Sequence, residues 1–278
     1  VAKLSFTGSD KVGWYLKSIC GKKKVTLELG GNAAVIVDED TDVESISDLV
    51  AKGAFLYAGQ ICISTQRIFV HAKVYDRFKS ALITSIGNLK VGDAQDETVL
   101  VGPVIDKGHL NRIDEWVQEA KDQGATALTG GQVKSEAHNL YAPTLLTDTT
   151  PSMKVAAEEV FGPVATFEKA ETFEEAIRMA NDSKYGLQVG VFTNSLKHFK
   201  YACEELEVGG EVTQVDRDKL ATYLMQINGL TKSSLVSFIQ SILPHREVKL
   251  NSILDFKDNN IHNEEFKDAF LQTLYELI

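Results

Sequence analysis

A single cysteine, Cys62, lies in a stretch whose residues suit a nucleophile. It follows a Gly59-Gln60 step at the end of an apolar segment with helical spacing, and a β-rich segment, residues 67–71, comes directly after it. A thiol at such a helix-to-strand junction is exposed while its surroundings stay packed, which a thiolate nucleophile requires. A buried core cysteine is the simpler interpretation of a lone cysteine. The neighbouring motifs therefore decide between the two.

A carboxylate, Glu28, stands just before the pair Gly30-Gly31, inside an apolar segment. A carboxyl group partly removed from water has a raised pKa, which is the condition for a general base near neutral pH. The alternative is a solvated residue on the polar face of a strand. The pattern alone leaves both interpretations open.

A strand-like run at residues 1–7 ends at Gly8-Ser9 and is followed by a helical pattern that contains Gly13. Free N–H groups at the start of a helix can hold a phosphate, so this turn is a candidate nucleotide-binding element. The alternative is that the turn only caps the helix.

The elements that must position these residues alternate regularly between strand and helix. Such alternation is typical of an α/β fold with an open, largely parallel sheet and helices on both faces. Apolar periodicity predicts strands at 1–7, 24–29, 33–37, 67–72, 125–128, 141–146, 165–168 and 188–193, and helices at 10–20, 43–58, 74–86, 106–123, 172–180 and 196–206.

The sequence changes character after Gly209-Gly210. Only one of the 20 glycines, Gly229, lies beyond residue 210, and helical patterns recur at 217–227, 233–243 and 264–278. We therefore expect a C-terminal all-helical segment, residues 211–278, of unknown role.

Composition excludes several classes of protein. The net charge of −10 argues against a nucleic-acid surface, and no apolar run is long enough to predict a membrane span. Cys20, Cys62 and Cys203 are too widely spaced for a disulfide framework, which favours a reducing compartment, the cytoplasm. We predict no metal site: the acidic loop 38–42 is better explained as a helix cap, and a calcium-like stretch near residue 255 has apolar residues where oxygen ligands are needed.

Four motifs follow one another in the first 163 residues: Phe6-Thr-Gly-Ser9, Leu27-Glu-Leu-Gly-Gly31, Gly59-Gln-Ile-Cys62 and Glu158-Glu-Val-Phe-Gly-Pro163. In order and approximate spacing they resemble the NAD(P)-dependent aldehyde dehydrogenase superfamily, and the resemblance covers about residues 1–210. It is closest to enzymes that act on small aldehydes, such as lactaldehyde or semialdehyde dehydrogenases.

The resemblance implies an oxidoreductase that converts an aldehyde to a carboxylic acid with NAD or NADP. Cys62 would form a thiohemiacetal and then a thioester, and Glu28 would activate the water that hydrolyses it. Glu159 would hold the nicotinamide ribose, with Phe161 nearby. Gly8 and Ser9 would face the pyrophosphate, and Leu29 would line the cofactor site. Cys20 and Cys203 are expected to be core residues.

The sequence also departs from the family pattern. The family has a coenzyme-binding region with an Asn that completes the oxyanion hole and a Lys that holds the adenosine ribose, and neither motif is present. We expect residues 1–31 to be the end of that region and residues 32–210 to be the catalytic domain. The alternative is a non-catalytic fragment or fusion, in which the α/β domain is a scaffold and the helical tail binds a partner. The expected partners are a small aldehyde and a protein or a second copy of the chain, with no nucleic acid and no membrane.

Overall fold

The computed structural model describes residues 2–214, so the helical segment predicted for the rest of the tail lies outside the described residues. The strands are β1 (Lys3–Thr7), β2 (Lys24–Glu28), β3 (Ala33–Val37), β4 (Thr65–His71), β5 (Thr126–Thr129), β6 (Val133–Ser135), β7 (Leu140–Tyr141), β8 (Thr144–Thr147), β9 (Val164–Ala170), β10 (Gln188–Phe192) and β11 (Gly210–Gln214). The helices are α1 (Asp10–Ile19), α2 (Val43–Phe55), a 3-10 helix η1 (Leu56–Gly59), α3 (Tyr75–Gly87), α4 (Lys107–Asp122), α5 (Lys154–Ala157), α6 (Phe173–Asn181) and α7 (Leu196–Glu205).

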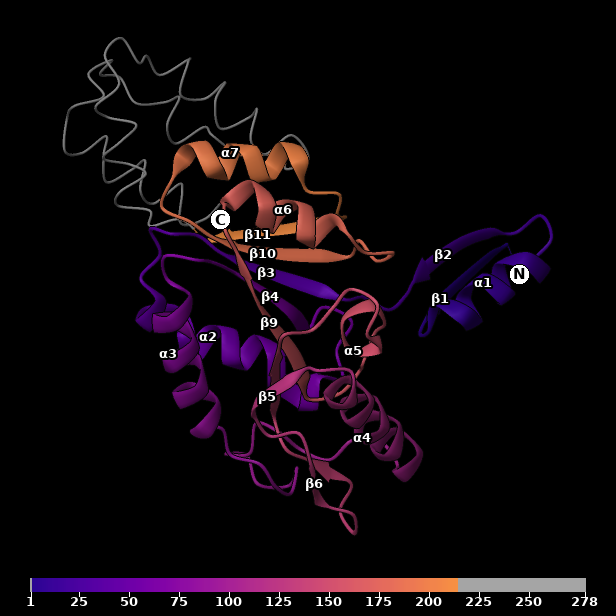
Figure 1. Cartoon of the computed structure of the whole chain (residues 1–278). Helices are drawn as coiled ribbons and strands as arrows, with labels where there is room; N and C mark the ends of the chain where they lie inside the picture. Colours follow the sequence, from indigo (N-terminus) through magenta and orange to yellow (C-terminus); the bar gives the residue numbers. More distant parts are fainter. Residues whose placement is uncertain (1, 215–278) are drawn as a thin grey trace, which may run out of the picture.

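A seven-stranded sheet in the order β11-β10-β3-β4-β9-β8-β5 forms the centre of the molecule (Figure 1). Its strands pair in parallel, except that β5 runs antiparallel to β8. Helices α6 and α7 cover one face, and α2 and α3 lie across the other. The structure thus confirms the predicted α/β architecture for the described residues.

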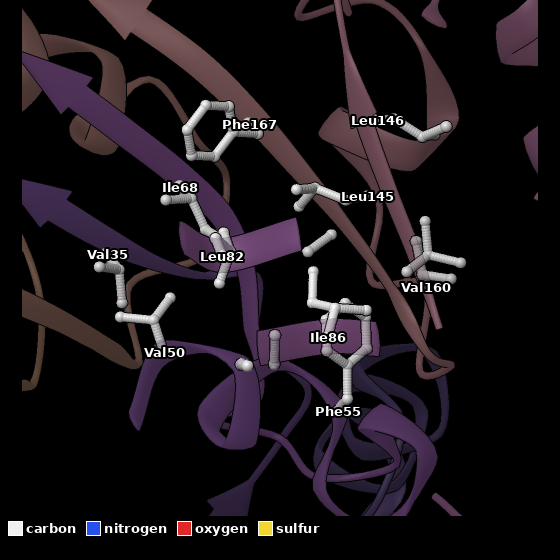
Figure 2. Packing of buried hydrophobic residues seen from close by; sticks show 14 of the residues in the cluster. Val35, Val50, Phe55, Ile68, Leu82, Ile86, Leu145, Leu146, Val160 and Phe167 are labelled. Atoms are coloured by element: carbon white, nitrogen blue, oxygen red, sulfur yellow. The ribbon is translucent and has the colours of Figure 1, made fainter. Parts of the chain in front are cut away.

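Alternation along the central strands explains why both faces of the sheet are covered. In β3, Val35 and Val37 belong to the larger apolar core with α2, α3 and α4, whereas Ala34 and Ile36 belong to the smaller core with α6 and α7. Every residue of β3 and of β4 is buried, as expected of parallel strands between two helical layers. Figure 2 shows the larger core, in which Phe55 and Ile86 lie close together.

A second, separate sheet joins β1 and β2 in parallel, with α1 as the crossover between them. This unit extends away from the seven-stranded sheet (Figure 1). Helix α1 exposes large apolar side chains on this unit: Val12, Trp14, Tyr15 and Ile19.

Local capping fixes the starts of three helices. The side chains of Asp106, Thr172 and Ser195 accept hydrogen bonds from backbone N–H groups in the first turns of α4, α6 and α7. Each such cap stabilises a helix by about 1 kcal/mol. The polar residues before these apolar patterns therefore explain why the helices begin where the periodicity predicts.

Asp38, directly after β3, forms polar contacts with residues that follow β10 and with α7. Its buried carboxylate accepts hydrogen bonds from the backbone N–H of Glu39 (2.7 Å) and from Oγ1 of Thr193 (2.6 Å). Oδ2 also lies 2.6 Å from Nδ1 of His198 on α7, whose ring stacks on Phe173 of α6. The acidic loop that begins at Asp38 therefore connects β3, β10 and α7.

The structure differs from the sequence prediction at residues 210–214. Strand β11 pairs with β10 in parallel over these residues, whereas the sequence analysis places residues 211–214 in the helical tail. The α/β fold thus continues at least to Gln214. Among the described residues, no helix has the length and apolar character needed to cross a membrane.

Candidate active site

Cys62 lies in a turn between η1 and β4, not at the end of a long helix. The sequence predicts a helix to about residue 58, but α2 ends at Phe55. The backbone is left-handed at Tyr57, Ala58 and Gly59 (φ 52°, 56° and 68°), so the α-helix cannot continue through them. A second turn, closed by the bond from the N–H of Ser64 to the carbonyl of Ile61 (3.0 Å), then carries the half-buried Cys62 into β4.

The double glycine lies directly against the Cys62 turn. A Cβ atom on Gly31 would come within 2.3 Å of the carbonyl oxygen of Cys62. A Cβ on Gly30 would come within 2.1 Å of Oε2 of Glu159. The N–H of Gly31 donates a hydrogen bond to Oε1 of Glu159 (3.0 Å). Gly31 is required because its close neighbour is a backbone atom, whereas a side chain on Gly30 would displace the Glu159 carboxylate from its present position.

A second pair of glycines brings the Gly59-Gln-Ile-Cys62 motif against the Glu158-Glu-Val-Phe-Gly-Pro163 motif. Gly59 has φ of +68°, and a Cβ on it would lie 2.1 Å from the carbonyl oxygen of Gly162. Together with the Gly31 contacts, this approach places three motifs far apart in the sequence at one location, at the N-terminal ends of β3, β4 and β9.

Glu159 is half-buried in the loop between α5 and β9. Burial raises the pKa of this carboxyl group, and the charge of Asp10 raises it further, whereas the Gly31 N–H and Arg112 oppose the shift. The backbone N–H of Glu159 donates to the hydroxyl of Tyr185 (3.2 Å).

Phe161, two residues after Glu159, has an unusual backbone conformation. It is half-buried and has a left-handed backbone (φ 44°), which is rare for a bulky residue and is held here by the surrounding contacts. Arg112 of α4 fixes the preceding residue by donating to the carbonyl of Val160 (2.7 Å).

Glu28 ends β2 as an exposed residue. Of the two interpretations that the sequence left open, the structure therefore agrees with the solvated residue on a strand, not with the partly buried carboxylate. The β1–α1–β2 unit stands apart from the main sheet, so among the described residues little covers this end of the strand. The carbonyl of Glu28 accepts the N–H of Gly8 (3.0 Å), which fixes the turn before α1.

Gly8 and Ser9 are exposed at the start of α1, where Ser9 is the N-cap residue but its side chain makes no capping hydrogen bond. Leu29 is half-buried, and its Cδ2 lies so close to Gly13 that a Cβ there would come within 2.4 Å of it. These three residues therefore share one unit with an open helix N-terminus, which suits an anionic group. Cys20 and Cys203 are half-buried, not core residues as expected.

Buried polar side chains of β4 support the site, and the sequence analysis gave them no role. Arg67 donates to the carbonyl of Asn32, next to Gly31, through Nε and Nη2 (3.2 and 3.1 Å), and to the last carbonyls of α6, Met179 and Ala180 (both 3.0 Å). Its burial lowers the pKa of the guanidinium to about 10, and the charge of Asp182 opposes that shift.

Gln66, Arg112 and Tyr185 also contact the Glu159 loop. Of these three residues, only Gln66 lies close in the sequence to a motif residue, four positions after Cys62. Arg112 and Tyr185 lie on elements without a motif, so their roles depend on tertiary contacts.

The residues present suit part of a dinucleotide site. Oε1 of Glu159 is bound by the Gly31 N–H, and among the described residues Oε2 accepts no hydrogen bond, so it is available for a ribose hydroxyl. The start of α1 is also open, because the side chain of Ser9 makes no capping hydrogen bond.

Comparison with known proteins agrees with this geometry. The model of the aldehyde dehydrogenase family matches residues 1–237, which extends beyond residue 210, where the sequence analysis ended the resemblance. The 3-sulfolactaldehyde dehydrogenase of Priestia aryabhattai is 40% identical over 233 residues, which are 84% of this chain and 48% of that protein. The NADP(+) succinate-semialdehyde dehydrogenase GabD of Escherichia coli (strain K12) is 34% identical, over 84% of this chain and 49% of its own length.

Solved structures give the same result. Aldehyde dehydrogenase 21 from Physcomitrella patens, in complex with the reaction product succinate, has a TM-score of 0.72 and 38% identity over 76% of this chain and 44% of its own. Lactaldehyde dehydrogenase from Escherichia coli has a TM-score of 0.74 and 33% identity over 78% of this chain and 46% of its own. The chain thus spans about half the length of the relatives it matches. With four motifs in order, three of them in direct contact, and a family match over residues 1–237, the chain belongs to the aldehyde dehydrogenase family.

Proposed function

We propose that this chain carries the nucleophile-bearing part of an NAD(P)-dependent aldehyde dehydrogenase, which oxidises an aldehyde to a carboxylic acid. The observation that supports this most directly is the contact of Gly31 with both the Cys62 turn and the Glu159 carboxylate. A nucleophile and a cofactor-binding carboxylate that share one backbone contact are held at a fixed separation.

Cys62 acts as the nucleophile in this proposal. Its thiolate attacks the aldehyde carbon, and the carbonyl oxygen becomes the oxyanion of a thiohemiacetal. The backbone N–H of Cys62 is a donor for that oxyanion. A bound NAD(P)+ would supply the hydride acceptor at this site, so that the carbon held by Cys62 could lose its hydride and become the carbonyl carbon of a thioester. Water then displaces the Cys62 thiolate and yields the carboxylic acid.

Glu28 takes the proton from that water. Its side chain is exposed at the end of β2, so solvent reaches it. Glu159, with Phe161 beside it in the sequence, would hold the nicotinamide ribose through Oε2, and Gly8, Ser9 and Leu29 would hold the phosphate side of the cofactor. Either NAD or NADP satisfies these contacts.

Small aldehydes that carry an anionic group or a hydroxyl are the proposed substrates. This choice is supported by the names of the relatives, which include 3-sulfolactaldehyde, succinate-semialdehyde and lactaldehyde dehydrogenases. Wide spacing of the cysteines, none of which forms a disulfide, supports a location in the cytoplasm.

The test is reduction of NAD and NADP by the purified protein with lactaldehyde and succinate semialdehyde, measured by absorbance of the reduced cofactor. Cys62→Ala should abolish turnover. Glu28→Gln should retain a burst of reduced cofactor, stoichiometric with Cys62, and then lower the steady-state rate by about 100-fold or more, because only thioester hydrolysis loses its base.

Cys20 and Cys203 provide the controls for the nucleophile. All three cysteines are half-buried, so exposure alone does not distinguish them. Cys20→Ser and Cys203→Ser should keep full activity. Preferential labelling of Cys62 by iodoacetamide without any turnover would instead favour the non-catalytic alternative, and Cys62→Ala with full activity would refute the proposed nucleophile.

A further inference from the structure

Gln66 is a buried residue of β4, four positions after Cys62, and its amide group is directed at the loop that carries Glu159. Nε2 donates hydrogen bonds to the carbonyl of Val155 (2.9 Å) and to the carbonyl of Glu158 (2.7 Å). Oε1 accepts the backbone N–H of Val160 (2.8 Å). One side chain thus binds three backbone groups within six residues, which we call the Glu159 segment (residues 155–160).

These bonds bracket Glu159. Its preceding carbonyl and its following N–H are both bound to Gln66, while its own N–H is bound to the hydroxyl of Tyr185. The side chain of Val160 is buried in the larger core, the same cluster that contains Leu145 and Leu146 (Figure 2). The direction of the Glu159 carboxylate is therefore set largely by Gln66 on one side and by core packing on the other.

The side-chain amide of Gln66 combines two N–H donors with one carbonyl acceptor, a combination that only Asn shares, on a shorter side chain. Both N–H groups and the carbonyl oxygen are used, so the buried amide leaves no donor unsatisfied. A carboxylate would turn an oxygen toward two carbonyl oxygens, and an aliphatic side chain would leave three backbone groups without a partner.

We propose that Gln66 is a positioning residue, which sets the Glu159 segment at a fixed place relative to the Cys62 turn so that Glu159 meets the cofactor ribose while Cys62 meets the aldehyde. The inference rests on the proposed function for the cofactor-binding role of Glu159. The three hydrogen bonds from Gln66 to the Glu159 segment, which we call the clamp, do not depend on that role. The proposal predicts that a change of Gln66 weakens cofactor binding but leaves the reactivity of Cys62 nearly unchanged.

The experiment compares Gln66→Leu with Thr166→Val in the purified protein. Thr166 is a matched control, because it is equally buried on the adjacent strand β9 and its hydroxyl donates only to the carbonyl of Gln66 (3.4 Å), not to the Glu159 segment. In Gln66→Leu, amide hydrogen exchange of the Glu159 segment should quicken, and the KM for NAD(P) should rise by about 10- to 100-fold from the loss of three hydrogen bonds. The rate of Cys62 alkylation and the kcat at saturating cofactor should change by less than about threefold. Thr166→Val should leave all four readouts near wild type.

Gln66→Glu adds a readout that general loss of stability does not reproduce. Protonation of the new carboxyl group restores one donor, so the KM for NAD(P) of this variant should fall toward the wild-type value as the pH is lowered, and that of Gln66→Leu should not. This variant also keeps the test open if the leucine variant does not fold.

Unchanged hydrogen exchange of residues 155–160 in both Gln66 variants would overturn the clamp. Faster exchange with an unchanged KM for NAD(P) would overturn its role in positioning. Absence of NAD(P) reduction by the wild-type protein would refute the proposed function, and with it the cofactor role of the clamp. This failure is distinguished from the others because it is measured on the wild-type protein alone.

Discussion

Gly31→Ala offers a sharp test of how the site is assembled. The added Cβ would lie 2.3 Å from the carbonyl oxygen of Cys62, a backbone atom that no rotamer change can move. Ordinary contact begins near 3.4 Å, so the Cys62 turn or the double glycine must shift by about 1 Å. Overpacking of this kind costs about 1–3 kcal/mol of folding free energy.

The functional cost should exceed the cost in stability. A displacement of about 1 Å at a reacting group is enough to lower turnover by about 100-fold, because attack requires close alignment of nucleophile and carbonyl. We therefore expect Gly31→Ala to remain folded in urea titrations, with a lower midpoint, while kcat/KM for the aldehyde falls by about two orders of magnitude.

Gly87→Ala is the matched control. Gly87 is the last residue of α3, and a Cβ there would meet no heavy atom within 4 Å. Alanine in a helix is favoured over glycine by about 0.5–1 kcal/mol, so this variant should be as stable as wild type or slightly more stable, with full activity. If Gly31→Ala behaves like Gly87→Ala in both assays, the reasoning that the double glycine is required by contact with Cys62 is refuted.

Two further predictions concern stability. Asp38→Ala should lower the free energy of unfolding by about 1–3 kcal/mol, since it removes the buried acceptor shared by Thr193 and His198. A urea midpoint close to wild type would show that water replaces the carboxylate. Glu168→Gln should flatten the pH dependence of stability, because burial raises the pKa of Glu168 and the carboxylate form is the disfavoured one in the folded state. Wild-type stability, measured by chemical denaturation between pH 4 and 8, should fall as pH rises from the unfolded pKa of Glu168 through its raised folded pKa, and the variant should lose that part of the pH dependence. Gln at this position still accepts both bonds from Thr149. Equal slopes of stability against pH in the two proteins would therefore contradict the argument.

Periodicity and capping residues were sufficient to predict most of the architecture. Apolar runs with period 2 or 3.6 mark the strands and helices, because each must bury one or two faces, and the predicted helix beginning near residue 172 agrees with the side-chain cap of Thr172 on α6. The prediction failed at residues 211–214, where the short β11 has no strong pattern of its own and is identified by its pairing with β10.

The sequence by itself supplied the motifs: a cysteine after Gly-Gln, a carboxylate before Gly-Gly, and a second carboxylate before Val-Phe-Gly-Pro, in an order that agrees with the family match. Only the tertiary structure decided why the glycines are needed and what holds the site together. Contacts of Gly31 with Cys62 and of Gln66 with the Glu159 segment join residues about 30 and 90 positions apart, and no local pattern encodes such approaches. The exposure of Glu28 was likewise a tertiary outcome, because burial depends on what covers a strand end, which the strand's own residues do not specify.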